Sequence, residues 1–122
     1  MKKLLLFGFD ELPAVLAVAS AVKPLGIETV PVSRREYDRP LEALAGLAPG
    51  GESLPASAGP LGGRMIVFCG LEDRLDELLP ALRRAGAGPE CLKAVLTPSN
   101  RNWSVLKLYS ELLREHQALG GR

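Results

Sequence analysis

The sequence is short of histidine, cysteine and surplus charge. It has one histidine and two cysteines, Cys69 and Cys91. A zinc site takes about four His or Cys ligands, so we expect no metal. Two distant cysteines also exclude a disulfide scaffold, and we expect both thiols to be reduced. Fifteen basic and fourteen acidic residues give a net charge of +1. This balance argues against nucleic acid as a partner, because phosphate binding draws on surplus Lys and Arg.

Long hydrophobic runs are missing as well. The uncharged stretch at residues 12–22 is far shorter than the roughly 20 apolar residues that span a bilayer. Asp10 and Glu11 interrupt the apolar run that begins at Leu4, which leaves it too short for the core of a secretory signal. We therefore expect a cytoplasmic protein that does not associate with a membrane.

The 122 residues fit one domain, 1–122, in which strand-like and helix-like patterns alternate. Apolar runs predict strands over 3–9, 27–32, 65–69 and 92–97. Helical spacing predicts helices over 11–22, 39–47, 71–85 and 103–119, the first capped by Asp10 and the last by Asn100 or Asn102. Pro80 predicts a kink in the third helix. Residues 49–63, rich in Gly, Pro and Ser, predict a long loop.

This alternation predicts an α/β fold with a four-stranded, mostly parallel sheet and helices packed on it. Pro31 cannot donate to a strand ladder, so its strand belongs at an edge and the simplest strand order is 2-1-3-4. A ferredoxin-like or mixed sheet is the alternative, because four short strands do not fix direction. We find no internal repeat beyond the alternation itself.

Ligands of parallel α/β sheets bind beyond the carboxyl ends of the strands. Here that rim would carry polar side chains that could bind a small anion. The candidate ligand-binding residues are Asp10, Thr97, Ser99, Asn100, Arg101 and Asn102. The structural alternative is that the Asn and Ser side chains cap helices while Trp103 packs in the core.

No catalytic constellation is complete, so we assign no catalytic residue and expect no cofactor. The third strand ends in Cys69, where a response-regulator receiver would carry its phosphorylated aspartate. Four residues separate Cys69 from Arg74, whereas a phosphatase loop needs five. His116 lies near a helix end, where its partial positive charge is favoured.

The segment LKAVLTPSNRNW, residues 92–103, with the leucine-rich helix after it, resembles the bacterial domain of unknown function 3783 family. The start at residues 5–10 looks similar too, so the resemblance covers nearly the whole chain outside 49–63. Its most specific part is Thr97, Asn100 and Trp103. The resemblance implies a small bacterial protein, with no assigned activity and no catalytic residues to carry over.

Three functions remain open from the sequence. We favour a non-enzymatic module that binds a small anionic ligand or a protein partner. The first alternative is a small enzyme acting on an anionic metabolite, with Asn100 and Arg101 binding the anion and Cys69 or Asp10 reacting. The second is a homo-oligomeric interaction protein, for example a homodimer joined through the edge strand or a helix face.

Overall fold

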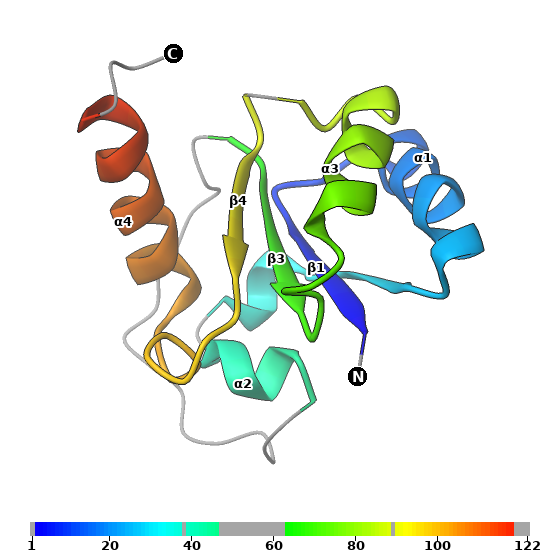
Figure 1. Ribbon diagram of the computed structural model, residues 1–122. Coiled ribbons are helices and arrows are strands. Elements are labelled where there is room, and N and C mark those ends of the chain that lie inside the picture. The colour runs from blue at the N-terminus through cyan, green and yellow to red at the C-terminus, as the bar shows by residue number, and fades with distance from the viewer. Residues whose placement is uncertain (1, 38, 47–62, 89, 119–122) are drawn as a thin grey trace.

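The computed structural model describes residues 2–37, 39–46, 63–88 and 90–118 (Figure 1). Most of the predicted 49–63 loop lies outside the described residues. The strands and helices alternate along the chain as the sequence predicts. They are β1 (Lys3–Phe7), α1 (Leu12–Val22), β2 (Glu28–Pro31), α2 (Leu41–Leu44), β3 (Met65–Cys69), α3 (Leu75–Arg84), β4 (Leu92–Val95) and α4 (Val105–Ala118), with short 3₁₀ turns at Lys23–Leu25 and Arg34–Glu36.

The sheet has the predicted order, β2-β1-β3-β4, with β2 at one edge. β1 runs parallel to β2, and β3 runs parallel to β4. The central pair is antiparallel, with Leu5 opposite Val67. The sheet is therefore mixed, which is the alternative that short strands leave open, while two of its three pairings are parallel.

Helices cover both faces of this sheet. α1 and α3 lie side by side on one face, and α2 and α4 lie against the other (Figure 1). Along β1, Leu4 and Leu6 point toward α1 and α3, whereas Leu5 and Phe7 point toward α2 and α4. A strand that is covered on both faces buries successive residues, which explains the continuous apolar runs of β1 and β3.

Two predicted helix caps are wrong. Glu11, not Asp10, precedes α1, and its side chain makes no capping hydrogen bond; Pro13 instead occupies the first turn, where a missing N–H does no harm. At α4, the Ser104 side chain accepts a hydrogen bond from the Lys107 N–H at 3.1 Å, so Ser104 takes the capping role we expected of Asn100 or Asn102.

The two halves of the chain follow the same path. Each half runs strand, helix, strand, helix, with its first helix on the α1–α3 face and its second on the other face. The strand–helix alternation therefore extends to a common arrangement of the two halves on the sheet. The sequence shows no repeat beyond this alternation because the halves share the placement of apolar residues and turns, and few identical residues.

Candidate functional site

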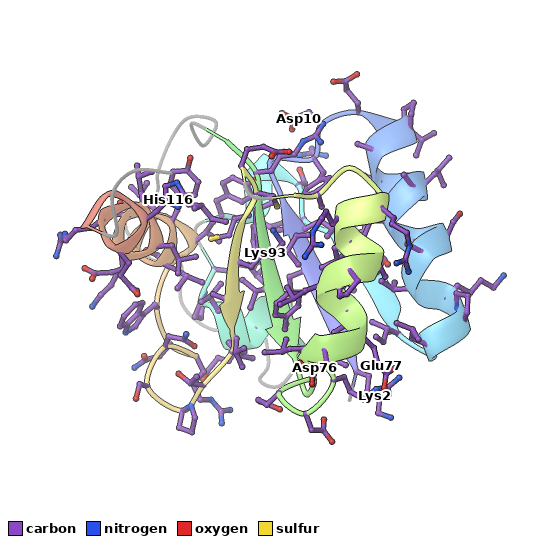
Figure 2. All side chains as sticks on the ribbon, turned by 45° about the horizontal axis from the view of Figure 1, so that its top comes forward. Lys2, Asp10, Asp76, Glu77, Lys93 and His116 are labelled. Carbon is purple, nitrogen blue, oxygen red and sulfur yellow. The ribbon has the colours of Figure 1, made fainter. Side chains whose placement is uncertain are left out.

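The predicted rim does not exist as one surface. Asp10 follows the carboxyl end of β1, whereas the turn at 97–103 follows β4, whose carboxyl end lies level with Phe68 and Leu4. Because β1 and β3 are antiparallel, Asp10 lies at the end of the sheet opposite this turn. Figure 2 shows Asp10 at one end of the molecule and Lys2, which precedes β1, at the other. The expectation that Asp10 joins the other candidates is wrong.

At its own end of the sheet, Asp10 lines an open hollow of about 510 Å³ between the carboxyl ends of β1 and β2. Ser33 and Arg35 line the same hollow, and Phe9 and Val32 contribute apolar surface. We missed Ser33 and Arg35 in the sequence. The signal was available, because both follow the strand that pairs in parallel with β1.

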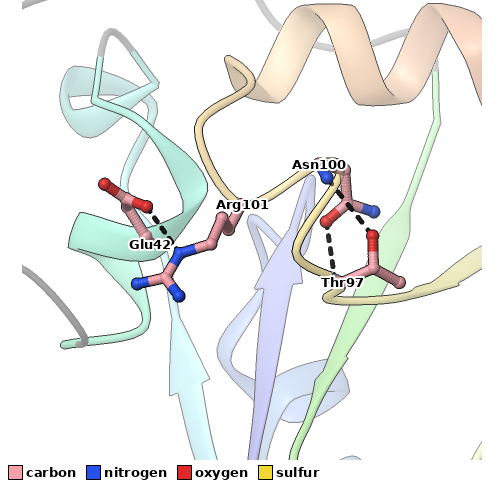
Figure 3. Close-up of polar contacts among 4 residues, drawn as sticks. All are labelled: Glu42, Thr97, Asn100 and Arg101. Carbon is pink, nitrogen blue, oxygen red and sulfur yellow. Dashed lines mark hydrogen bonds and ion pairs between the residues drawn. The ribbon is translucent and has the colours of Figure 1, made fainter.

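Thr97 and Asn100 brace the turn against itself (Figure 3). The Asn100 side-chain oxygen accepts a hydrogen bond from the Thr97 N–H at 2.8 Å, and the Asn100 N–H donates to the Thr97 hydroxyl at 3.2 Å. The Asn100 amide group also donates to the Val95 carbonyl at 3.1 Å. With 9% of its surface exposed, Asn100 is committed to contacts within the chain.

Arg101 fastens the turn to α2. Its guanidinium nitrogen lies 2.7 Å from the Glu42 carboxylate (Figure 3). The Leu41 and Glu42 N–H groups donate to the carbonyls of Trp103 and Arg101, respectively. These contacts satisfy N–H groups at the start of α2 that the helix itself leaves unpaired.

The outer part of the turn carries the remaining candidates. Ser99, Arg101 and Asn102 are exposed. Trp103 is partly buried against the α2–α4 core, with the Lys107 ammonium 4.5 Å from its ring centre. Anion binding by the exposed side chains stays a prediction, while Thr97 and Asn100 have a clear structural role.

The cysteines lack the properties of activated thiols. Cys69 and Cys91 are both buried. Burial raises the pKa of each thiol to about 11, although Lys3 near Cys69 and Lys93 near Cys91 partly oppose the shift. A thiol with this pKa is almost entirely protonated near neutral pH, so neither cysteine is a ready nucleophile.

One surface was not predicted at all. The side of α1 turned away from the sheet, which we call the α1 outer face, is exposed at Leu12, Pro13, Leu16, Ala17 and Ser20. Leu12 is 66% exposed and Leu16 is 54% exposed. No charged residue occurs between Leu12 and Val22. The signal was an eleven-residue helix without charge; we predicted the helix but weighed its lack of charge only as a sign of a membrane span.

The described part of the chain has neither a cluster of metal-binding side chains nor a membrane-spanning helix. No three His, Cys, Asp or Glu side chains among the described residues are grouped to hold a metal ion. None of the helices described combines the length and the hydropathy needed to cross a bilayer.

Comparison with known proteins finds a family match for the second half of the chain. No curated protein and no solved structure matches the sequence. One family does match, from Arg64 onward, and the matched segment contains Thr97, Asn100 and Trp103. The match does not extend to residues 5–10, so it is narrower than the resemblance we inferred. Residues 64–119 of this chain form a DUF3783 domain, a domain of unknown function.

Proposed function

We propose that this protein is a non-enzymatic binding module that associates with a second copy of itself through the α1 outer face. The observation that carries the proposal is the complete absence of charge on an exposed helix. Helices at the surface of a monomer normally turn a charged or polar face to water, and a helix that is apolar all round is normally buried. The α1 outer face therefore has the composition of a surface that is covered.

α3 supplies an internal comparison. It lies beside α1 on the same face of the sheet and joins its own pair of parallel strands. Its exposed positions carry charges of both signs, at Asp76, Glu77, Arg83 and Arg84. A helix at this place in the fold thus tolerates a charged outer face, and packing against the sheet does not explain the uncharged face of α1.

The sheet edges are poorly suited to association. On β2, Pro31 has no N–H to offer to a further strand. On β4, the Asn100 side chain occupies the Val95 carbonyl, and Lys93 folds back onto the carbonyls of Gly88 and Cys91. Proline and lysine on edge strands are common devices against strand addition. These features favour a helix face over an edge strand as the contact.

The charges at the ends of α1 favour a second copy as the partner. Glu11 precedes the helix and Lys23 follows it, about 18 Å apart along the axis, and both are exposed. An antiparallel pair of α1 helices centred on Ala17 brings the helix end that carries Glu11 in each copy level with the end that carries Lys23 in the other. Such a two-fold contact is self-complementary, and the small Ala17 side chain at its centre lets the helices approach closely.

The mass of the protein in solution tests the proposal. Light scattering with size exclusion, from about 10 µM to about 1 mM, should show a monomer–dimer equilibrium, since a patch of this size supports only modest affinity. Leu16→Glu should leave a folded monomer. Lys23→Glu should weaken the dimer, and the exchanged pair Glu11→Lys/Lys23→Glu should restore it.

The matched control is Leu113→Glu, which places the same charge on an exposed leucine of α4, where 37% of the residue surface is accessible. This variant should dimerise like the parent. A parent protein that is monomeric over the whole range overturns the proposal, as does a loss of association in the control equal to that in Leu16→Glu.

A further inference from the structure

The strand pairings of the two halves superimpose residue by residue. In each half the inner strand is β1 or β3 and the outer strand is β2 or β4. Adding 62 to the residue numbers of β1 and 64 to those of β2 converts every β1–β2 pairing into a β3–β4 pairing. Lys3 opposite Glu28 becomes Met65 opposite Leu92, and Leu6 opposite Pro31 becomes Phe68 opposite Val95. At the centre, Leu5 lies opposite Val67, its own equivalent. The halves are therefore related by a local two-fold axis through this pair.

The turns repeat with the strands. A glycine with positive φ follows each inner strand, Gly8 at 78° and Gly70 at 70°. Another follows the first helix of each half, Gly26 at 75° and Gly86 at 91°, although the chain from this glycine to the outer strand is longer in the second half. Positive φ is a conformation that glycine adopts most readily, so both halves place this residue where the same backbone path requires it.

The segments after the outer strands repeat as well. The N–H groups of Glu36 and Asn100 donate to the carbonyls of Ser33 and Thr97, respectively, which are 64 residues apart. Three residues on, Arg39 and Trp103 repeat the pattern, donating to the carbonyls of Glu36 and Asn100. Each segment then leads into a helix whose first residue, Leu41 or Val105, is completely buried. Such agreement over strands, turns and helix starts is not expected of two unrelated segments.

From this agreement we infer that residues 3–46 and 65–118 are two copies of one βαβα unit. We also infer that the edge of β3 facing β1 is an interaction surface built to take a second unit of the same kind. In this chain the N-terminal unit supplies that partner. The family match covers the C-terminal unit alone.

The burial of β3 supports the inference that each unit requires a second one. All five residues of β3 are buried, and β1 covers its inner edge. A single unit would have only two strands and would leave that edge and much of the apolar surface open to water. Two-stranded sheets are marginal by themselves in water. One unit therefore requires a second unit to cover its inner edge and its apolar surface. In this chain the antiparallel pairing of β1 with β3 provides that cover within the same molecule.

The first test transfers the Thr97–Asn100 brace to the N-terminal copy. In the double variant Ser33→Thr/Glu36→Asn, the new amide should accept from the N–H of residue 33 and donate to the Pro31 carbonyl, as Asn100 does to Val95. Glu36 is exposed, so the replacement removes no buried contact. The midpoint of thermal unfolding should rise by about 3 °C, whereas Ser33→Thr/Glu36→Ala should give no rise. A graft that unfolds at or below the alanine control contradicts the equivalence.

The second test asks whether the inner edge accepts a unit from another chain. The Lys3 ammonium donates to the Ala45 carbonyl at 3.1 Å, so the N-terminal unit ends beside the start of β1. Gly63 lies at the other end of β1, beside Gly8. A Cβ added to Gly8 would be 2.5 Å from the carbonyl oxygen of Gly63. Lys3 and Gly8 are about 16 Å apart along the strand. Replacing residues 47–62 by one glycine leaves a reach of about 7.6 Å, too short for pairing within the chain.

Both arms of this test carry Leu16→Glu, which keeps association through α1 out of the result. The shortened chain should form folded assemblies of two or more chains with an unchanged circular dichroism spectrum, because its units can pair only in trans. The parent linker should give a monomer. A shortened chain that is a folded monomer, or that does not fold at about 100 µM, overturns the inference. A parent protein without Leu16→Glu that fails to dimerise would instead count against α1 association alone.

Discussion

The Asn100 side chain joins two backbone groups of the segment that leads from β4 into α4. It accepts from the Thr97 N–H and donates to the Val95 carbonyl, while its own N–H meets the Thr97 hydroxyl. Little of the residue is in contact with water, so the Thr97 N–H and the Val95 carbonyl would lose their partner if the side-chain amide were removed. Unpaired buried polar groups cost about 1–3 kcal/mol each.

Asn100→Ala should therefore lower the free energy of unfolding by about 3 kcal/mol, measured by urea denaturation. Asn100→Asp keeps the acceptor for Thr97 but loses the donor to Val95, and it should fall between alanine and the parent. Arg101→Ala removes an exposed ion pair with Glu42 and should cost under about 1 kcal/mol. Equal losses in Asn100→Ala and Arg101→Ala would contradict the structural role assigned to Asn100.

Sequence reasoning singled out the polar residues of this turn but left two roles open for them. Asn, Ser and Thr after a strand are suited to anion binding and to backbone bracing alike. For Thr97 and Asn100 the structure favours backbone bracing over anion binding, since their polar groups form hydrogen bonds with each other. Asp10 was grouped with them only because a parallel sheet was assumed, and one antiparallel pairing carries it to the opposite end of the molecule.

At the scale of the element, strand order was predictable and strand direction was not. Pro31 identifies an edge strand because of a missing N–H, and this chemistry does not depend on direction. An apolar run such as residues 65–69 has the same pattern in a parallel or an antiparallel pair. The connection between α2 and β3, residues 45–64, is long enough for either arrangement. The uncharged α1 was visible in the sequence, but its exposure was not.

Pro80 interrupts the backbone hydrogen bonds within α3. The helix begins at Leu75, so Pro80 lies beyond the first turn, where it cannot donate to the carbonyl of Asp76. Pro80→Ala should restore this hydrogen bond and raise the free energy of unfolding by about 1–2 kcal/mol, after allowing for the greater entropy of the unfolded chain. Urea denaturation of the Leu16→Glu variant, which keeps association out of the measurement, gives the value.

Pro13 is the control for Pro80, because it lies in the first turn of α1 and removes no helical hydrogen bond. Pro13→Ala in the same background should leave stability unchanged or slightly lower. If the two alanine variants behave alike, the cost of Pro80 does not arise from its place within the helix.

At the scale of the whole molecule, two similar units share one pair of cores. The cluster under α1 and α3 contains Leu4 and Val18 from one half together with Phe68 and Leu82 from the other. The cluster on the opposite face likewise joins Phe7 and Leu41 to residues of β3 and α4. Neither half can unfold without exposing the apolar surface of its partner. The repeat is thus visible in the architecture but should not appear as two separate folding transitions.

Val67→Ala provides the test at this scale, because Val67 is completely buried and lies opposite Leu5 on the local two-fold axis. Removing two methyl groups there should cost about 1.5–3 kcal/mol. Native-state hydrogen exchange should show the slowest amides of β1 and β3 losing protection by the same amount, since both depend on global unfolding. Leu113→Glu, on the exposed side of α4, should leave these amides unchanged. Loss of protection confined to β3 and β4 would mean that the C-terminal unit opens alone, contrary to a structure in which each unit completes the core of the other.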